Sequence, residues 1–424
     1  MIQRETIGRS ATAYSKYAWR RLTWNSPNNS ADGNIMDRSG DSLPHIVNLA
    51  DMRRQAWRRL PRMVFDFIDG GAEDEVTLRR NRRQFEDIAL EHRVFVDVQD
   101  VDTGVDLFGH RYDLPFGISP TGLAGLAWPG AELLLADAAW GRNIPVCLSS
   151  VSSVTLEDVA LRNAHPKWFQ LYIFKDRQLS RELMERAWNS GYKVLFITAD
   201  CAVGGNRERD PRNDFTLPLK ISARTVLDFL THPHWLMQVA FCGAPKPVNM
   251  VEAALRAAAG QSAQGLVQFM NDQLDPSVEW DTVAEFVRDW PGDVVIKGVL
   301  SREDACRSEQ VGASGIVVSN HGGRQLDGAT SVLRLLPEIR ASVSDGFQVF
   351  CDGGFRRGAD IVKALALGAD TILMGRNTLY GVGGAGLSGA TKVIDILADE
   401  LVRTLKLMGV SRVRDISVDQ LVRL

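Results

Sequence analysis

The chain has 424 residues, of which 45% are hydrophobic and 24% charged, a balance typical of a folded globular protein and not of a disordered, collagen-like or coiled-coil chain. The formal net charge of −3 gives no overall basic field, so nucleic acid is not an expected partner. The five cysteines form no Cys-x-x-Cys pair and no apolar run reaches about 18 residues, which argues against a disulfide framework, a zinc ribbon or a transmembrane helix and favours a reducing compartment.

The N-terminal residues differ in composition from the rest of the chain. Residues 1–31 carry five basic side chains and one acidic side chain, Glu5, and are rich in serine and asparagine. We therefore expect residues 1–40 to be a basic, disordered arm. Three interpretations are open: a solvated tail without a function of its own, a segment that contacts a membrane surface or a partner, and an organelle transit peptide. The arm lacks the apolar core of a secretory signal peptide.

Eight short apolar runs predict the strands of a parallel sheet that is buried on both faces. Helical patterns lie between them, for example at residues 130–140, 181–190, 302–310 and 358–366. The alternation predicts a (β/α)8 TIM barrel within residues 41–424. A doubly wound sheet is the alternative, but polar residues at the ends of nearly all the runs favour the barrel. The runs are residues 114–119, 146–150, 168–173, 194–200, 294–299, 315–320, 348–353 and 371–376.

One connection is much longer than the others. The fourth run starts at residue 194 and the fifth at residue 294, so the loop between them, residues 201–276, is enlarged and is expected to be functional or partly disordered. Residues 226–242 of this loop are apolar, and residues 217–247 carry three basic side chains and one acidic side chain. Such a segment could lie on a bilayer surface, or it could be a lid or subunit contact that packs on protein. Before the barrel, the helical extension at residues 44–113 could cover either end of it.

Polar side chains follow nearly every predicted strand, where the active site of a barrel is expected. His321, with Arg324 three residues later, combines a general base for neutral pH with a group that can grip a carboxylate. Asp200 could orient this histidine and stabilise its charged form, or it could be a helix N-cap. Lys297 in a buried strand needs an anionic partner, often a cofactor atom. The ends of the last two runs combine glycine with arginine and predict a phosphate site at Gly353, Gly354, Gly375, Arg356 and Arg376.

Residues 319–327, Ser-Asn-His-Gly-Gly-Arg-Gln-Leu-Asp, resemble the active-site signature of the FMN-dependent L-2-hydroxy acid oxidising family. The resemblance runs from about residue 60 to about residue 416 and implies an FMN-binding (β/α)8 barrel. It implies that His321 is the catalytic base, Asp200 its carboxylate partner and Lys297 a positive charge beside the flavin. Tyr172 is expected to face the substrate hydroxyl, and Arg207 and Arg324 are expected to act on the substrate carboxylate. The implied FMN contacts are Pro120, Thr121, Gly122, Ser149, Gln170, Thr198, Lys297, Ser319, Asp352, Gly353, Gly354, Arg356, Gly375 and Arg376, and no metal ion is expected.

The sequence departs from the family pattern at positions that bear on substrate and acceptor. Phe67 stands where the family usually has a tyrosine that donates a hydrogen bond to the substrate carboxylate, a loss of about 1.5–3 kcal/mol. Either the affinity is lower, or a different acid or an acid derivative is bound. Gly122 stands where oxidases of the family tend to have alanine, and glycine there resembles the membrane-linked dehydrogenases. Val151 and Gly204 are small, so the substrate pocket should accept a side chain larger than that of glycolate, including an aryl group.

The resemblance therefore implies oxidation of an L-2-hydroxy acid, lactate- or mandelate-like, to the 2-oxo acid, with electrons passed to a quinone or another non-oxygen acceptor. The alternatives are an oxidase that produces hydrogen peroxide and a tailoring enzyme whose substrate is altered because of Phe67. The enlarged loop is similar to the membrane-binding segment of bacterial mandelate and lactate dehydrogenases in the family, so residues 217–247 are expected to contact a membrane surface. A cytoplasmic protein is expected, peripheral on the inner face of the membrane if this contact forms. The family also implies a homo-oligomer, with a tetramer as the expectation.

Overall fold

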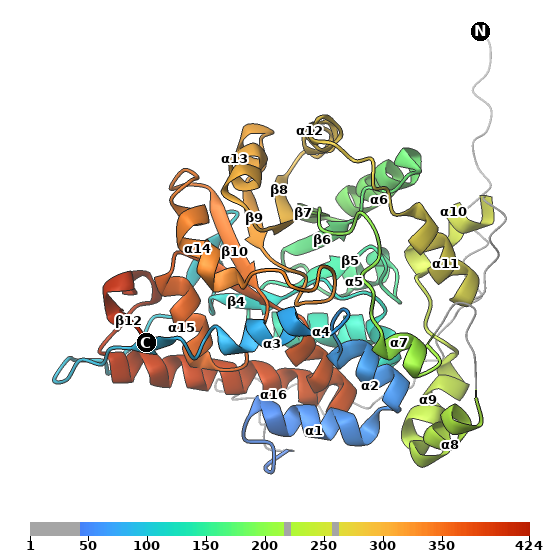
Figure 1. The fold of residues 1–424 in the computed structure, drawn as a ribbon, viewed down its shortest axis with the longest axis horizontal. Helices are drawn as coiled ribbons and strands as arrows, with labels where there is room; N and C mark the ends of the chain where they lie inside the picture. The colour runs from blue at the N-terminus through green and yellow to red at the C-terminus, as the bar shows by residue number, and fades with distance from the viewer. Residues whose placement is uncertain (1–42, 216–221, 257–262) are drawn as a thin grey trace, which may run out of the picture. The chain divides into compact units, whose positions relative to one another are not determined.

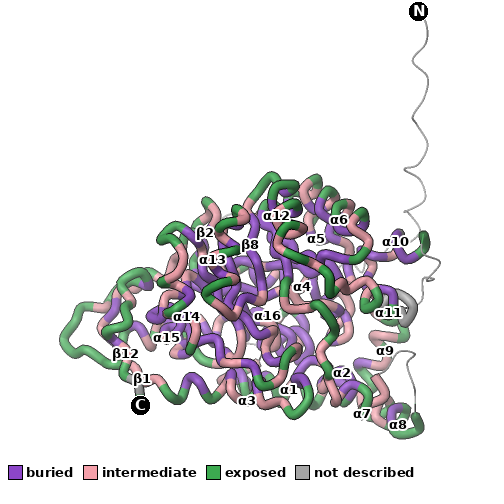
Figure 2. Tube along the Cα trace, turned by 45° about the horizontal axis from the view of Figure 1, so that its top comes forward, coloured by how far each residue is buried: buried purple, intermediate pink, exposed green. Residues whose placement is uncertain are grey.

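The structure is a computed structural model that describes residues 43–215, 222–256 and 263–424. The expected disordered arm, residues 1–40, lies outside these residues. Eight parallel strands occupy the centre of the described part and helices surround them (Figure 1). Nearly all residues of these strands are buried, and the trace is purple around β8 (Figure 2), as expected for a parallel sheet with both faces covered.

All eight predicted strands are confirmed. Their order around the sheet follows the order along the chain, and β4 pairs with β11 at the other end of the sequence. A parallel bridge between Ile118 and Val146 joins β4 to β5, so that the sheet nearly closes into a barrel. The strands are β4 (Phe116–Ile118), β5 (Cys147–Ser149), β6 (Lys167–Leu171), β7 (Tyr192–Thr198), β8 (Asp293–Val299), β9 (Gly315–Val318), β10 (Gln348–Asp352) and β11 (Thr371–Met374).

A helix follows each strand before the next one begins, which confirms the (β/α)8 alternation. Several of these helices start at a residue whose side chain accepts a hydrogen bond from a backbone N–H in the first turn, as Thr155, Asp176 and Ser301 do. The helices are α4 (Ala131–Trp140), α5 (Leu156–Arg162), α6 (Arg177–Asn189), α12 (Trp280–Asp289), α13 (Arg302–Gln310), α14 (Val332–Arg340), α15 (Gly358–Ala366) and α16 (Arg376–Met408).

The interior of the barrel is built in layers because side chains that point inward recur every second residue along a strand. One layer is aromatic: the ring of Trp168 lies 5.3 Å from that of Phe196 and 5.8 Å from that of Phe350. A hairpin of β2 (Val105–Leu107) and β3 (His110–Tyr112) packs against this layer through Phe108, whose ring centre is 5.8 Å from that of Trp168. The side chains two positions further along the same strands form a second layer. This layer is polar and lies towards the end of the barrel at which the strands finish.

The segment before the barrel covers both of its ends: the β2–β3 hairpin closes the end with the aromatic layer, and the helices fold over the mouth at which the strands end. It forms α1 (Leu49–Arg59), α2 (Arg62–Asp69) and α3 (Val76–Arg83), with Pro61 as the N-cap of α2. After α3, β1 (Ile88–Leu90) pairs with β12 (Leu421–Arg423) near the C-terminus. Helix α2 supplies Phe67 to the cavity at the barrel mouth.

The enlarged connection after β7 holds several helices. They are α7 (Arg209–Arg212), α8 (Ala223–Thr231), α9 (Pro233–Cys242), α10 (Val251–Arg256) and α11 (Ala263–Gln273). Helices α8 and α9 pack on the barrel mouth through one face, where the Trp235 indole N–H donates to Leu126 O at 2.8 Å. Their other face is apolar and exposed at Leu227, Leu230 and Phe241. The segment therefore packs on protein and presents an apolar surface at the same time.

Candidate functional site

A cavity of about 640 Å³ opens at the mouth of the barrel. Its wall comes from α2, from the loops after the strands and from the inner face of α8 and α9. Most of the residues predicted from the sequence line it, from widely separated parts of the chain. They are Phe67, Pro120, Thr121, Gly122, Val151, Tyr172, Gly204, Arg207, Lys297, His321, Arg324, Asp352, Gly353, Gly354, Arg356, Gly375 and Arg376.

His321 lines this cavity, and Asp200, which does not line it, forms a hydrogen-bonded pair with the histidine. The distance from His321 Nδ1 to Asp200 Oδ1 is 3.0 Å, and His321 adopts a left-handed backbone with φ of 55°. Burial by itself would raise the pKa of the Asp200 carboxyl, but the charge and hydrogen bond of His321, with the charge of Lys297, hold that pKa below its usual value. The carboxylate therefore stays ionised and fixes the ring through Nδ1, which leaves Nε2 as the nitrogen that can accept a proton.

The Asp200 side chain has room beside β8 only because Gly298 has no side chain. A Cβ at Gly298 would lie 2.6 Å from Asp200 Cγ, and its φ of 105° is one that residues with side chains rarely adopt. Gly298 follows Lys297 directly, so one strand end positions both the carboxylate and the buried lysine.

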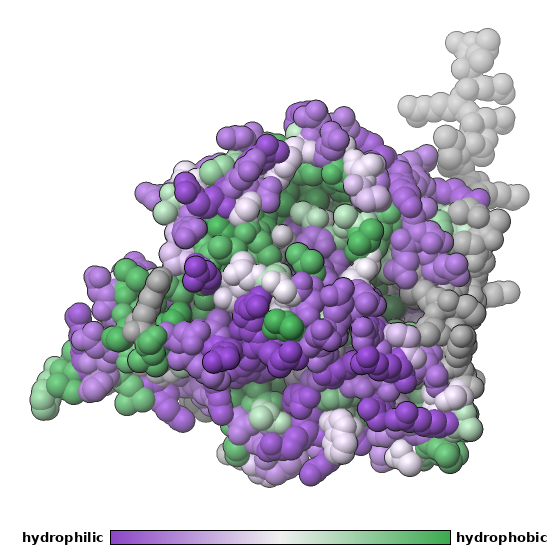
Figure 3. All heavy atoms as spheres, in the orientation of Figure 1, coloured by the Kyte–Doolittle hydropathy of each residue, from purple (hydrophilic) through white to green (hydrophobic). Residues whose placement is uncertain are grey.

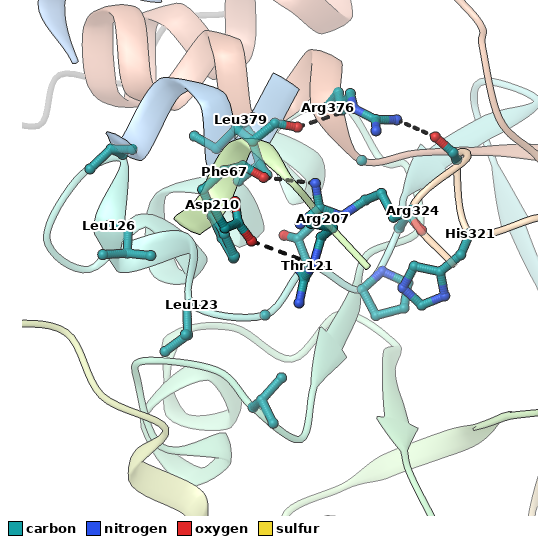
Figure 4. Close-up of a pocket in the computed structure, with 18 of the residues that line it drawn as sticks. Phe67, Thr121, Leu123, Leu126, Arg207, Asp210, His321, Arg324, Arg376 and Leu379 are labelled. Carbon is teal, nitrogen blue, oxygen red and sulfur yellow. Dashed lines mark hydrogen bonds and ion pairs between the residues drawn. The ribbon is translucent and has the colours of Figure 1, made fainter. Parts of the chain in front are cut away.

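Two arginines lie side by side in the cavity, between Phe67 and Asp210 on one side and His321 on the other (Figure 4). Arg324 Nη1 donates to the backbone oxygens of Phe67 at 2.7 Å and of Gly70 at 3.1 Å, and Arg207 Nε lies 3.5 Å from Asp210 Oδ2. Burial and the neighbouring charges of Arg207 and Arg376 lower the pKa of Arg324. An anion between these groups would relieve the mutual repulsion, so the cavity is suited to a carboxylate.

Phe67 packs against both guanidinium groups. The guanidinium carbons of Arg324 and Arg207 lie 5.2 Å and 5.6 Å from the centre of its ring. The ring thus supplies a cation–π contact where a tyrosine would supply the same contact and a hydroxyl.

Lys297 is buried at the end of β8 and has two polar partners. Its Nζ lies 2.8 Å from Asp352 Oδ2 and donates to Ser319 Oγ at 3.0 Å. Burial lowers the pKa of the lysine, but the carboxylates of Asp352 and Asp200 raise it by more, so the ammonium keeps its charge. The other oxygen of Asp352, Oδ1, is buried without a hydrogen-bond partner. A buried acceptor of this kind requires a donor, such as a hydroxyl of a bound group.

A series of side-chain hydrogen bonds joins the three neighbouring strands β5, β6 and β7. Ser149 Oγ donates to Gln170 Oε1 at 2.9 Å, and Gln170 Nε2 donates to Thr198 Oγ1 at 2.9 Å. These side chains follow Cys147, Trp168 and Phe196 by two positions, which places them in the polar layer above the aromatic one.

The predicted phosphate site combines glycines, whose backbone N–H groups a ligand can approach, with two arginines. Arg356 Nη1 donates to Asn377 Oδ1 at 2.6 Å. Arg376 donates to the backbone oxygens of Ile68 at 3.1 Å, Gly322 at 2.8 Å and Gly70 at 2.7 Å, so it ties the end of α2 to the loop that carries His321. Only glycine fits at position 354, because a Cβ there would lie 2.0 Å from the backbone oxygen of Asn81. The phosphate contacts of these residues stay predictions.

The residues present fit an FMN group. The unpartnered Asp352 oxygen suits a ribityl hydroxyl, the Lys297 ammonium suits a flavin ring that gains negative charge on reduction, and Arg356 with the glycines suits a phosphate.

Three further parts of the cavity wall are not among the site residues predicted from the sequence. Asp210 follows Arg207 by three positions, which is the spacing of an ion pair on a helix and could have been noticed. Cys201 follows Asp200 directly, and its sulfur lies 3.8 Å from His321 Nδ1. The inner faces of α8 and α9 contribute Phe229, Trp235, Leu236 and Val239. The period of these apolar residues indicates an inner face, but not what it covers.

Comparison with known proteins decides the family. A family described as FMN-dependent dehydrogenase matches residues 56–423. The chain belongs to the FMN-dependent dehydrogenase family. FMN is therefore its cofactor, as the resemblance implied, and the recognised family is confirmed.

Relatives in this family are similar to the chain in sequence and in fold. It is 40% identical over 378 residues to (S)-mandelate dehydrogenase of Pseudomonas putida, covering 89% of this chain and 94% of the relative. It is 41% identical over 373 residues to an L-lactate dehydrogenase of Caulobacter vibrioides, covering 88% and 96%. The structure described as monotopic membrane protein (S)-mandelate dehydrogenase superposes with a TM-score of 0.85 at 39% identity, covering 89% of this chain and 99% of that one. A mandelate oxidase with benzoyl-formic acid superposes with a TM-score of 0.74 at 35% identity, covering 89% and 98%.

Membrane-spanning segments are a separate question from membrane contact. None of the helices in the described ranges has the length and apolar composition needed to cross a bilayer.

Proposed function

We propose that this FMN-dependent dehydrogenase oxidises an L-2-hydroxy acid to the corresponding 2-oxo acid. The observation that carries the proposal is that His321, paired with Asp200 at 3.0 Å from Nδ1 to Oδ1, lines the same cavity as Arg207, Arg324 and Lys297. A base beside a carboxylate-binding pair of cations suits chemistry at the carbon next to a carboxylate. The relatives named as mandelate and lactate dehydrogenases support this reaction class.

Each side chain has a task that follows from its place. FMN, when bound, supplies the acceptor for the two electrons that leave the substrate. Arg207 and Arg324 hold the substrate carboxylate, and Tyr172 lies on the same cavity wall to face the hydroxyl. His321 accepts a proton at Nε2, and Asp200 stabilises the imidazolium that forms. Lys297 keeps its positive charge where the flavin ring is expected.

The cavity favours a substrate with a substantial apolar side chain. Val151 and Gly204 are small residues of the cavity wall, and Leu123, Phe229 and Trp235 extend the apolar wall towards α8 and α9. An aryl group would bury more apolar surface there than the methyl group of lactate, at about 25 cal/mol for each Å². We therefore place a mandelate-like acid ahead of lactate.

The proposed acceptor is a quinone, reached at a membrane surface on the cytoplasmic side. Leu227 and Leu230 on α8 are 65% and 62% exposed and Phe241 on α9 is 87% exposed, so the outer face of this helix pair offers apolar side chains to a bilayer. Figure 3 shows apolar atoms at the surface where α8 lies, at its lower right. The related monotopic mandelate dehydrogenase supports a peripheral membrane contact.

The homo-tetramer implied by the family remains a prediction, which the mass of the purified protein in solution tests.

The test of the reaction is anaerobic reduction of the bound flavin by (S)-mandelate, L-lactate, glycolate and long-chain L-2-hydroxy acids. We expect rapid bleaching by at least one acid. His321→Ala should retain FMN and slow reduction by about 100- to 10,000-fold, the usual contribution of a general base. The control His92→Ala changes an exposed histidine and should reduce at the normal rate. Near-normal reduction in His321→Ala, or bleaching by none of the acids, would reject the proposal.

An oxygen-using oxidase is the second candidate function, because a mandelate oxidase has the same fold at 35% identity. Gly122 favours the dehydrogenase. A Cβ at this position would lie 2.4 Å from Val151 Cγ2, so the alanine usual in oxidases does not fit here without movement of Val151. Mixing the reduced enzyme rapidly with air distinguishes the two: slow reoxidation is expected, and fast reoxidation with stoichiometric peroxide would assign the oxidase.

A further inference from the structure

The Cys201 side chain lies against the catalytic pair and has no role in the proposed reaction. Its Sγ is 3.5 Å from Asp200 Oδ1 and 3.8 Å from His321 Nδ1, and these two atoms are 3.0 Å from each other. A thiol, an imidazole nitrogen and a carboxylate oxygen thus form a triangle at the cavity wall. In the described part of the chain, no other trio of histidine, cysteine and carboxylate side chains has its ligand atoms within 4.8 Å of one another.

The dimensions of this triangle match the coordination of a tetrahedral metal ion. Zinc binds nitrogen and oxygen at about 2.0–2.2 Å and sulfur at about 2.3 Å, so neighbouring ligand atoms of a tetrahedral zinc ion lie about 3.3–3.6 Å apart. The three separations bracket this range and differ from it by about 0.3 Å or less. The fourth coordination position would face the cavity, because Cys201 and His321 both line it.

A second observation concerns the carboxylate of the same triangle. The other carboxylate oxygen of Asp200, Oδ2, is buried and has no hydrogen-bond partner. The His321 hydrogen bond uses only Oδ1, so the carboxylate has unused capacity to accept a donor or to bind an ion through either oxygen.

Charge restricts the kind of ion. The positive charges of Lys297 and Arg207 act on Cys201 and oppose any cation. A thiolate and the Asp200 carboxylate together supply two negative charges, which balance a divalent ion. An ion that forms strong bonds to sulfur gains most from this set, whereas Mg²⁺ and Ca²⁺ prefer oxygen alone.

We propose that Asp200, Cys201 and His321 form an inhibitory site for a sulfur-binding divalent cation such as Zn²⁺. The ion takes the place of the proton that Asp200 and His321 share at Nδ1, and that proton moves to Nε2, the other nitrogen of the neutral ring. His321 can no longer accept a proton there, and Asp200 no longer stabilises an imidazolium. Binding also converts the Cys201 thiol to a thiolate and releases its proton to solvent.

The experiment titrates the FMN-loaded enzyme with buffered Zn²⁺ and measures binding by calorimetry and flavin reduction by its best acid. We expect about one ion per chain, with loss of flavin reduction that a chelator reverses. Cys201→Ser should weaken Zn²⁺ binding by at least about tenfold, because a hydroxyl is a poor substitute for a thiolate. Inhibition in each variant is expressed relative to the metal-free rate of that same variant.

The matched control is Cys306→Ser, which changes a half-buried cysteine outside the cavity whose sulfur contacts Ser342 O. It should bind Zn²⁺ as the unaltered enzyme does. If Cys201→Ser does not fold, Cys201→Ala takes its place. Absence of Zn²⁺ binding to the unaltered enzyme, or equal binding with and without Cys201, would overturn the proposal.

A second readout is independent of turnover and therefore of the proposed reaction. Co²⁺ bound tetrahedrally with a thiolate absorbs at wavelengths longer than those of oxidised flavin. These bands should appear on addition of Co²⁺ to the unaltered enzyme and to Cys306→Ser, and they should be absent in Cys201→Ser. Bands that persist without Cys201 would place the ion elsewhere and reject this site.

Discussion

Gly298 sets the position of the catalytic carboxylate. A Cβ at this residue would overlap Asp200, and the backbone φ of 105° adds strain for any other residue. We predict that Gly298→Ala displaces Asp200 from His321 and slows flavin reduction by about tenfold or more, since a misplacement of about 1 Å can cost about 100-fold. FMN should remain bound, and anaerobic reduction kinetics measure the effect.

The control for this prediction is Gly346→Ala. Gly346 is exposed and a Cβ there meets nothing within 4 Å, so the substitution should leave the reduction rate unchanged. A Gly298→Ala enzyme that reduces its flavin at the normal rate would show that Asp200 does not need this space.

Phe67 offers a residue-scale test of carboxylate binding. Its ring already contacts both arginines, so Phe67→Tyr adds a hydroxyl beside the carboxylate site with little other change. A hydrogen bond to a charged group contributes about 1.5–3 kcal/mol, so we predict that KM for the acid falls about tenfold or more. Phe67→Leu removes the ring without adding a donor and should raise KM. Steady-state kinetics of both variants check the prediction, and an unchanged KM in Phe67→Tyr would show that the substrate carboxylate does not reach this position.

At the scale of elements, the predicted strands and their polar ends agree with the structure because both depend on local pattern. The sequence shows each buried strand as an apolar run. It also shows a polar residue two positions after the last apolar residue that points inward, as in Trp168 with Gln170 and Phe350 with Asp352. The sequence does not predict the place of α2, because its amphipathic pattern shows that one face is buried but not which end of the barrel buries it.

The helix pair α8 and α9 has one buried and one exposed apolar face. Trp235 is 6% exposed and faces the barrel mouth, whereas Leu227, Leu230 and Phe241 are exposed. We predict that replacing Leu227 and Leu230 by Glu reduces sedimentation of the protein with phospholipid vesicles and leaves flavin reduction by a water-soluble acid unchanged. Charged side chains in place of apolar ones lose the burial that holds a peripheral helix in the interface.

A matched substitution away from this surface controls for added charge. Leu161→Glu changes an exposed leucine at 85% exposure on α5 and should leave vesicle binding as it was. Equal vesicle binding in all three proteins would reject α8 as the membrane contact.

At the scale of the whole molecule, Asp69 joins four helices. The carboxylate at the end of α2 accepts from Arg53 Nε on α1 at 2.7 Å and from the Tyr380 hydroxyl on α16 at 2.7 Å, and Arg209 Nη1 on α7 lies 3.1 Å away. Burial alone would raise the pKa of Asp69, but the hydrogen bonds of Arg53 and Tyr380 and the charge of Arg53 lower it from 3.8 to about 2.

This lowered pKa predicts a pH dependence of stability. A folded pKa below the unfolded value means that the contribution of Asp69 is present above about pH 4 and is lost as the pH falls towards 2. Its size is about 2 kcal/mol, from about 1.36 kcal/mol for each pKa unit. The difference in unfolding free energy between the unaltered protein and Asp69→Asn should therefore shrink over this interval. Denaturant unfolding at several pH values measures it, with Asp345→Asn, an exposed carboxylate, as the variant that should show no such trend.

The sequence predicts the barrel, its eight strands and the polar side chains at their ends, because short apolar runs and the residues that follow each run are local features of the chain. It also determined the family, because His321, Arg324 and their glycines form one contiguous signature. Three features became visible in the fold alone: α2 covers the mouth, Gly298 makes room for Asp200, and Cys201 lies against His321. These are contacts between distant segments, and no local pattern encodes which buried faces meet. The same reason applies to α8 and α9, whose apolar residues face both ways: the sequence shows that they are apolar, and only the fold shows which of them are left exposed.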